Sequence, residues 1–302
     1  DIKGSLSRSI YGTAPMAVER TDPVTPLATT PVAPLPSVAV VDVEKKIPKG
    51  KKNPNAYAVV FGIEQYKNVS PVTYARRDAY WMREYFAKTL GVPEENIYYK
   101  TDIDVGKAEF DKVFSQGGWL DKRIGDGKSD LYIFYAGHGA PDFNSRTAFL
   151  IPYDGDPNYA SQTGYAVDKM TANLSQLEAR SVTVFLDACF SGANRENEIL
   201  LAGARPVFLD VNTAVAANVT LFSAASGNQI SSSWSEKQHG IFSYWLMKGM
   251  QGSADANRDN RLTVEELGEF IRNNVSTTAG KLDREQTPVL QTMDREKILV
   301  KF

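Results

Sequence analysis

A cysteine and a histidine each follow an apolar run that predicts a buried β-strand. Cys189 is the only cysteine of the 302 residues and comes shortly after the run 181–186. His138 is one of two histidines and stands between two glycines after the run 131–136. Because the carboxyl ends of parallel strands lie at one edge of a sheet, we expect the two side chains to meet there. A thiolate is a strong nucleophile and imidazole can exchange its proton near neutral pH, so the pair is a candidate catalytic dyad.

The glycines beside His138 could assist this chemistry. They allow the backbone to approach a substrate carbonyl closely, and the amides of Gly139 and Cys189 are candidates for an oxyanion hole. The position at strand ends leaves two plainer interpretations open. Cys189 could be an inert buried thiol, and His138 could serve packing or the surface. The second histidine, His239, falls in a predicted polar loop and follows no strand.

Strand patterns and helix patterns alternate along the chain, and these elements must position the dyad. Buried strands are predicted at 57–63, 131–136, 181–186 and 220–224, with shorter ones at 96–100 and 148–151. Apolar residues three and four positions apart predict helices at 75–90, 105–124, 171–180, 241–250 and 264–275. The alternation predicts an α/β fold with a mostly parallel central sheet flanked by helices on both faces.

Two motifs carry a resemblance to a known family. YAGHG at 135–139 and LDACFSG at 186–192 resemble the histidine and cysteine motifs of the caspase-fold cysteine peptidases, most closely the bacterial caspase-like and metacaspase-like branch. The similarity covers residues 56–295 and includes VVFGIEQY, ARRDA, IPYD, SAASGNQ, HGIFSYWL and QTPVL in family order. It implies the caspase-like (caspase-hemoglobinase) fold and hydrolysis of peptide bonds, with His138 as general base and Cys189 as nucleophile.

The sequence departs from the metacaspase pattern at two positions. Ala136 stands where those proteins commonly have Ser, and Phe190 stands where they commonly have His after the cysteine. Neither departure removes a member of the dyad. The departures leave the subgroup within the family open.

The resemblance also suggests which residue precedes the cleaved bond. Caspases proper cut after Asp with basic residues in the first pocket, whereas the metacaspase-like branch cuts after Arg or Lys with acidic ones. Asp78, Asp154 and Asp187 match the acidic positions, and a guanidinium offers several donors to such carboxylates. Singly, each aspartate has a plainer role as a helix-terminus charge, a turn residue or a cap. Together they predict cleavage after Arg or Lys, although Arg76 and Arg77 could neutralise Asp78.

Residues 255–266 fit the loop pattern of EF-hand calcium sites. The candidate ligands are Asp255, Asn257, Asp259, Arg261 through its carbonyl, and Glu266. Asn260 stands where the pattern has glycine, and asparagine tolerates the left-handed backbone conformation of that position. The alternative is an acidic turn that holds no metal. Calcium is therefore a candidate ligand, whereas the peptidase chemistry requires no cofactor.

The N-terminal part of the chain has a different composition, because 7 of the 15 prolines fall in the first 50 residues. We expect a Pro/Thr-rich pro-segment or linker at 1–53 and the caspase-like peptidase domain at 54–302. Lysines between 45 and 52 offer a route to shed this segment. Within the loop 193–219, Arg195 is the expected site of self-cleavage, and the alternative is a loop that stays whole.

Composition limits the partners. Lys plus Arg is 34 and Asp plus Glu is 36, so a net charge of −2 gives no basic surplus for nucleic acid. No apolar run has the length of a membrane span, and a single cysteine excludes an intramolecular disulfide. The expected partners are protein or peptide substrates. The segment 297–302 could pair internally or with another copy, so the oligomeric state stays open.

Other functions remain compatible with the same residues. A catalytically silent caspase-fold scaffold or regulator is the main alternative, and an acyl-transfer enzyme such as a peptide ligase would use the same dyad. The proline-rich start favours an exported or cell-envelope location in a bacterium, although nothing in the sequence names the compartment.

Overall fold

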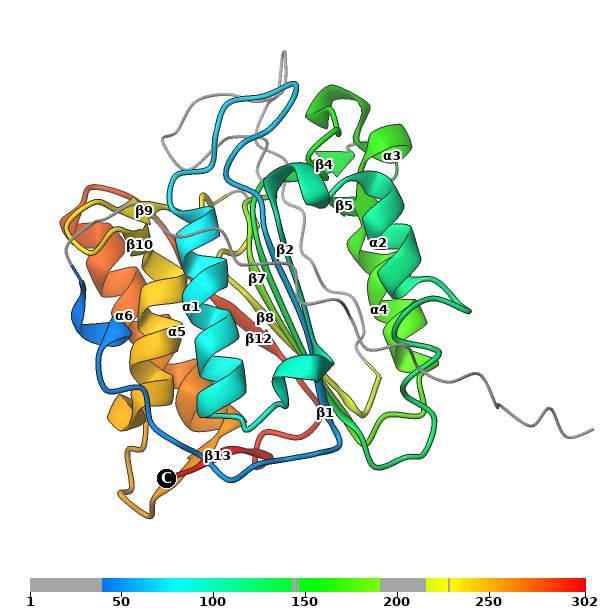
Figure 1. Ribbon diagram of the computed structural model, residues 1–302. Helices are drawn as coiled ribbons and strands as arrows, with labels where there is room; N and C mark the ends of the chain where they lie inside the picture. Colours follow the sequence, from blue (N-terminus) through cyan, green and yellow to red (C-terminus); the bar gives the residue numbers. More distant parts are fainter. Residues whose placement is uncertain (1–39, 143–144, 146, 191–215, 228) are drawn as a thin grey trace, which may run out of the picture. The chain divides into compact units, whose positions relative to one another are not determined.

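The computed structural model describes residues 40–142, 145, 147–190, 216–227 and 229–302, which belong to one compact unit, Ala33–Phe302. A six-stranded sheet forms its centre (Figure 1). In sheet order the strands are β12 (Val289–Gln291), β8 (Val219–Ser223), β7 (Ser181–Asp187), β3 (Asp130–Ala136), β1 (Ala56–Gly62) and β2 (Ile97–Thr101). Strands β8 to β2 run parallel, and β12 pairs antiparallel with β8. The predicted α/β fold with a mostly parallel sheet is confirmed.

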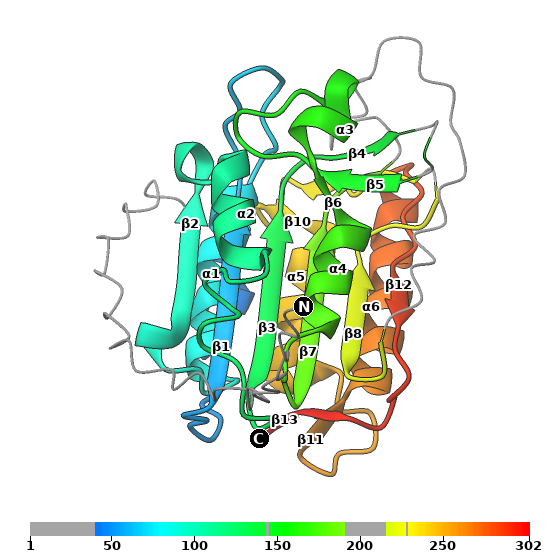
Figure 2. The ribbon, with the colours of Figure 1, turned by 90° about the vertical axis from the view of Figure 1, so that its right-hand side faces the viewer.

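Helices cover both faces of this sheet, which is why its central strands are buried along their whole length (Figures 1 and 2). Every residue of β3 and β7 is buried. One face carries α1 (Ala75–Lys88), α5 (Ile241–Lys248) and α6 (Val264–Lys281), and the other carries α2 (Lys107–Phe114) and α4 (Val167–Ser175). None of the helices in the described part of the chain is both long and apolar enough to cross a membrane.

Some element boundaries differ from the sequence prediction. The helix predicted at 105–124 is α2 and ends at Phe114, where Ser115 adopts an extended conformation with a ψ of 157°, and Gly117 then turns the backbone with a φ of 73°. The helix predicted at 171–180 is α4 and lies several residues earlier. The strand predicted at 148–151 is β5 (Thr147–Leu150), which joins a separate antiparallel sheet with β4 (Gly139–Asp142) and β6 (Tyr165–Ala166).

The remaining elements are short. The hairpin of β9 (Ser233–Trp234) and β10 (His239–Gly240) precedes α5, and β11 (Arg261–Thr263) pairs with β13 (Ile298–Lys301). The C-terminal strand is therefore paired within the chain. The others are α3 (Ala160–Thr163), a π-helical turn Gly249–Ser253 and 3-10 turns at Asp42–Glu44, Glu94–Asn96, Asp102–Asp104 and Pro157–Tyr159.

Packing of the compact unit begins before residue 54. Val43 is completely buried, Gly50 N donates to Lys88 O at 2.9 Å, and Asn53 N donates to Gly91 O at 2.9 Å. The lysine-rich stretch 45–52 thus runs along the carboxyl end of α1. A role as pro-segment stays a prediction, and residues 1–39 lie outside the described part.

Candidate active site

Strands β3 and β7 end side by side and bring both motifs to one edge of the sheet. Their last residues, Ala136 and Asp187, are register partners, and Gly137 N donates a hydrogen bond of 3.3 Å to Asp187 O. A Cβ atom added to Gly139 would stand 2.5 Å from Cys189 O, so the two backbones touch there. The structure therefore brings the segment that carries His138 against the segment that carries Cys189.

The imidazole of His138 is held from two sides. Its Nε2 lies 2.7 Å from Ser70 O, and since a carbonyl oxygen only accepts, Nε2 carries the proton. Nδ1 is then the basic nitrogen of the neutral ring. The ring of Tyr66 lies 4.7 Å from the imidazole, centroid to centroid, and Tyr66 Oη accepts a hydrogen bond of 2.7 Å from His138 N. Sequence reasoning did not identify the Ser70 carbonyl.

The sulfur of Cys189 lies against the backbone of Ser231. Ser231 N donates to Cys189 Sγ at 2.7 Å, and Sγ lies 3.3 Å from Ser231 O. Cys189 is 4% exposed and His138 is 2% exposed. An N–H group that points at sulfur can hold a thiolate, but in this conformation Ser231 also covers the nucleophile.

Two of the three predicted pocket aspartates contact the chain that follows Ser231. Asp187 is completely buried and accepts hydrogen bonds from the hydroxyls of Ser231 and Ser243. Asp78, also buried, accepts from His239 Nδ1 at 2.7 Å and from Gly240 N at 3.0 Å. Both carboxylates thus fasten residues 231–243 beside the ends of β1 and β7.

The third aspartate, Asp154, lies apart from these contacts. It is exposed and accepts a hydrogen bond of 2.9 Å from Lys107 N in the first turn of α2. The two arginines next to Asp78 pair with other carboxylates. Arg76 Nη1 lies 3.4 Å from Asp102 Oδ2, and Arg77 Nη2 lies 2.6 Å from Glu44 Oε1. The structure therefore joins Asp78 and Asp187 to one segment and leaves Asp154 at a helix end.

The side chains of the candidate calcium loop point back to their own backbone. Asp255 and Asn257 accept hydrogen bonds from Asp259 N, while Glu266 accepts from Thr263 N and Oγ1 and caps α6. Asn260 does adopt the left-handed conformation, with a φ of 63°. In the described residues no three His, Cys, Asp or Glu side chains are arranged to hold a metal ion. Calcium binding at this loop stays a prediction.

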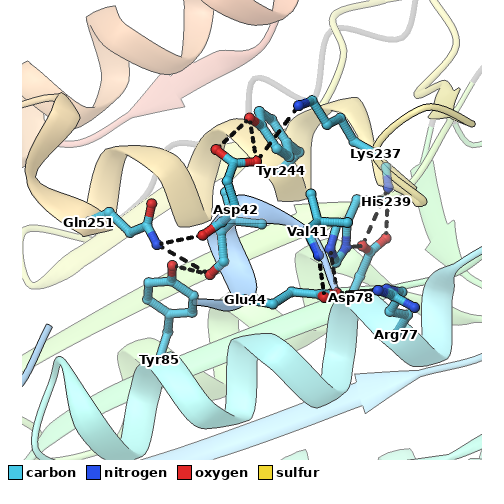
Figure 3. A network of polar contacts seen from close by, with 12 residues as sticks. Val41, Asp42, Glu44, Arg77, Asp78, Tyr85, Lys237, His239, Tyr244 and Gln251 are labelled. Atoms are coloured by element: carbon cyan, nitrogen blue, oxygen red, sulfur yellow. Dashed lines mark hydrogen bonds and ion pairs between the residues drawn. The ribbon is translucent and has the colours of Figure 1, made fainter. Parts of the chain in front are cut away.

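A buried polar network surrounds His239, and the prediction that this residue falls in a polar loop is wrong (Figure 3). His239 is 0% exposed and lies in β10 between Asp78 and Glu44. Burial alone would lower the pKa of His239, but the two carboxylates outweigh it and raise the pKa above its ordinary value. The last site prediction, self-cleavage at Arg195, lies outside the described residues.

Comparisons with known proteins agree with this architecture. Among solved structures, a protein of Geobacter sulfurreducens has a TM-score of 0.54 and 16% identity over 79% of this chain and 93% of its own. Caspase-1 of Spodoptera frugiperda has a TM-score of 0.50 and 16% identity over 85% of this chain and 94% of its own. At such identities these likenesses show the fold alone. No curated protein sequence matches the chain.

The family of the chain is shown by its match to a protein-family model. The model described as Caspase domain matches residues 55–299, which is most of the chain. The matched region contains both strand-end motifs and the sheet that joins them. The chain therefore belongs to the caspase-domain family of cysteine peptidases.

Proposed function

We propose that this protein is a cysteine endopeptidase of the metacaspase-like branch that hydrolyses peptide bonds after arginine or lysine. Its substrates are proteins or peptides, as its family implies. The observation that carries the proposal is the meeting of the His138 and Cys189 segments at the ends of two adjacent parallel strands, where Gly139 lies against the backbone of Cys189. The hydrogen bond from His138 Nε2 to Ser70 O supports it, because the proton on Nε2 makes Nδ1 the basic nitrogen of the neutral ring.

The reaction follows from these groups. His138 takes the thiol proton of Cys189, and the thiolate attacks the carbonyl carbon of the substrate. The amides of Gly139 and Cys189 are the proposed donors to the oxyanion. His138 then gives its proton to the leaving amine, and water, activated by the same imidazole, hydrolyses the thioester.

Labelling with an arginyl peptide that carries a thiol-reactive electrophile tests this proposal. We expect one adduct per chain, on Cys189, and no adduct in Cys189→Ala. His138→Ala should keep the fold and lose both labelling by this peptide and peptide hydrolysis. Hydrolysis of the matching substrate by Cys189→Ala at the wild-type rate would overturn the assignment. Addition of an amine acceptor would show whether ligation competes with hydrolysis.

The proposed preference for arginine or lysine before the cleaved bond rests on the acidic groups beside the nucleophile. Asp187 stands two residues before Cys189 and is completely buried, and a guanidinium suits carboxylate acceptors in such surroundings. Two fluorogenic peptides that differ only in Arg or Asp before the cleaved bond provide the test. We expect faster release from the Arg peptide, and the opposite order would reject the preference.

Self-processing at Arg195 is part of the same proposal, as a zymogen step. It predicts a mass difference between purified wild type and Cys189→Ala, with the cut after Arg195. Equal intact masses after prolonged incubation would show that the chain stays whole.

One observation favours the alternative of a catalytically silent caspase-fold protein. Cys189 is only 4% exposed, and the backbone of Ser231 lies on its sulfur. A silent protein would not react with the arginyl electrophile under conditions where it is folded. The labelling experiment therefore separates the two functions directly.

A further inference from the structure

The residues Val41–Lys45, here called the N-terminal clasp, bind three separate elements of the domain (Figure 3). Tyr85 Oη of α1 donates to Val43 O at 2.6 Å. Gln251 Nε2, which follows α5, donates to Lys45 O at 2.8 Å and also approaches the carbonyls of Asp42 and Val43. Asp42 accepts from Lys248 Nζ at 2.9 Å and pairs with Lys237 at 3.7 Å.

The centre of the clasp is a buried ion-pair network. Glu44 Oε1 lies 2.6 Å from Arg77 Nη2 and 3.1 Å from His239 Nε2. On the other side of the ring, His239 Nδ1 lies 2.7 Å from Asp78 Oδ1. Both ring nitrogens face carboxylate oxygens, so both donate, and only the imidazolium form can do that. Two carboxylates thus face two cations, with the side chains of Glu44, Asp78 and His239 at most 1% exposed.

The same histidine belongs to the chain that covers the nucleophile. We call residues 231–240 the cover segment, which contains the β9–β10 hairpin. At its start, the backbone of Ser231 contacts Cys189 Sγ at 2.7 Å. At its end, Gly240 N donates to Asp78 Oδ2 at 3.0 Å beside His239. Ile241 N donates to Ser232 O at 2.9 Å, so the two ends of the segment also hold each other.

We propose that the N-terminal clasp holds the cover segment against Cys189 through His239, so that weakening the clasp uncovers the thiol. The contacts form one continuous path from Glu44 to His239, through the hairpin to Ser231, and from Ser231 to the sulfur. A buried imidazolium that loses one of its two carboxylates is less stable in place, which favours conformations with the hairpin displaced. Glu44 and His239 are therefore positioning residues that act on Cys189 through Ser231.

The reactivity of the single cysteine reports this coupling directly, in the full chain and without any substrate. Iodoacetamide alkylation of Cys189 is measured at one pH for wild type, Glu44→Gln and Gln251→Ala. The first variant removes a carboxylate from His239, and the second removes only neutral hydrogen bonds to the clasp, so it preserves every buried charge. We expect about tenfold faster alkylation in Glu44→Gln and about threefold faster alkylation in Gln251→Ala.

Glu84→Gln is the matched control. Glu84 lies on α1, is partly buried and pairs with Lys88 and Arg83, so the rate of Cys189 alkylation in Glu84→Gln should equal that of wild type. Hydrogen exchange distinguishes local release from general destabilisation. Amides of the cover segment should exchange faster in the two clasp variants, while those of β3 and β7 should keep their protection.

Two results would overturn the inference. One is an unchanged alkylation rate in both clasp variants while they remain folded, and the other is faster exchange in β3 and β7 to the same extent as in the cover segment. The coupling between the clasp and Cys189 is independent of the proposed function; only its consequence, control of peptidase activity, rests on that function. Faster alkylation in a protein that hydrolyses no peptide would reject the peptidase and keep the clasp, whereas hydrolysis with unchanged alkylation would do the reverse.

Discussion

His239 is held in its charged form by carboxylates from two different elements. Asp78 on α1 and Glu44 in the N-terminal clasp raise the pKa of His239 against the effect of burial. Burial alone would raise the pKa of Glu44, but hydrogen bonds from His239, the Val41 amide and Arg77 hold it below its usual value. A group with a raised folded pKa stabilises the fold below its ordinary pKa, and this contribution is lost as pH rises through the folded pKa. The contribution of Glu44 is lost as pH falls through its lowered pKa.

Glu44→Gln should therefore lower the pKa of His239. One of the two carboxylates on the imidazolium becomes a neutral amide, while Asp78 and Arg77 keep their charges. NMR titration of the imidazole protons measures this, and His138→Ala assigns the signals because the chain has two histidines. Wild-type His239 should titrate above 6.5, the ordinary value. Equal titration in wild type and variant would show that Glu44 does not act on the ring.

Gly139 allows the two motifs to touch, so Gly139→Ala should disturb the candidate site. The added methyl group would stand 2.5 Å from Cys189 O and 2.7 Å from the Phe190 ring. We expect a loss of about 2 kcal/mol in the free energy of unfolding, and strongly reduced arginyl-peptide hydrolysis. Gly280→Ala is the control, because among the described residues no other part of the domain lies within 4 Å of a methyl group there, and it should be neutral or stabilising by about 0.5 kcal/mol. A free energy of unfolding equal to that of wild type in Gly139→Ala would contradict the close contact between Gly139 and the backbone of Cys189.

The reactive side chains that follow buried strands could be predicted from the sequence, but the groups that contact them could not. His138 and Cys189 stand out because each follows a buried strand. The Ser70 and Ser231 groups that contact them are backbone atoms, which no residue type identifies. His239 was misplaced because its partners Asp78 and Glu44 lie 161 and 195 positions away, and no local pattern signals such pairs.

Among the elements, α6 shows that the last residue of the predicted calcium pattern, Glu266, also has a structural role. Thr263 Oγ1 accepts from Glu266 N, and the Glu266 carboxylate accepts from Thr263 N, which together form a capping box. Only Oε2 of Glu266 takes part in the cap; Oε1 is buried and has no hydrogen-bond partner in the described part of the chain. The same glutamate satisfies both sequence patterns, and the cap is the one that the structure adopts.

Thr263→Ala should remove this cap and cost about 1 kcal/mol in the free energy of unfolding. Thr277→Ala is a matched control in the same helix, where the exposed hydroxyl donates to Asn273 O one turn earlier. That change should stay within about 0.5 kcal/mol, because alanine favours helix. Urea unfolding followed by circular dichroism measures both. Equal losses in the two variants would mean that the box does not stabilise α6.

Apolar runs predicted strands well because a sheet covered on both faces needs continuous apolar strands. The pattern could not tell which strand belongs to which sheet, so β5 was expected without its separate antiparallel sheet. Helix ends were least certain. The apolar spacing through Val113 and Phe114 favoured a longer helix, whereas the extended backbone of Ser115 ends it before the turn at Gly117.

At the scale of the whole molecule, residues near the start of the packed domain contact elements that lie far along the sequence. The N-terminal clasp contacts α1, the hairpin and the end of α5, as Figure 3 shows for Tyr85, His239 and Gln251. Composition predicted a linker or pro-segment up to residue 53, since nearly half of the prolines fall there and lysines gather at its end. The residues that dock, Val43 and Glu44, are too few to form a recognisable pattern, although they fix the beginning of the packed domain.

A chain that begins at residue 47 should therefore be less stable than one that begins at residue 40. The shorter chain lacks Glu44, so His239 and Arg77 lose a buried partner, and it also lacks the buried side chain of Val43. Removal of one partner from a buried ion pair costs about 3 kcal/mol or more.

Denaturant unfolding of the two chains across pH measures the difference between their free energies of unfolding. The ion pair between Glu44 and His239 needs both side chains charged. The difference in free energy of unfolding should therefore be largest below the ordinary histidine pKa of 6.5, and it should shrink as pH rises through the raised pKa of His239. It should shrink again in acid, below the lowered pKa of Glu44. A difference that is constant across this whole range would mean that the clasp is held by apolar packing alone, and that its charges do not fasten the hairpin.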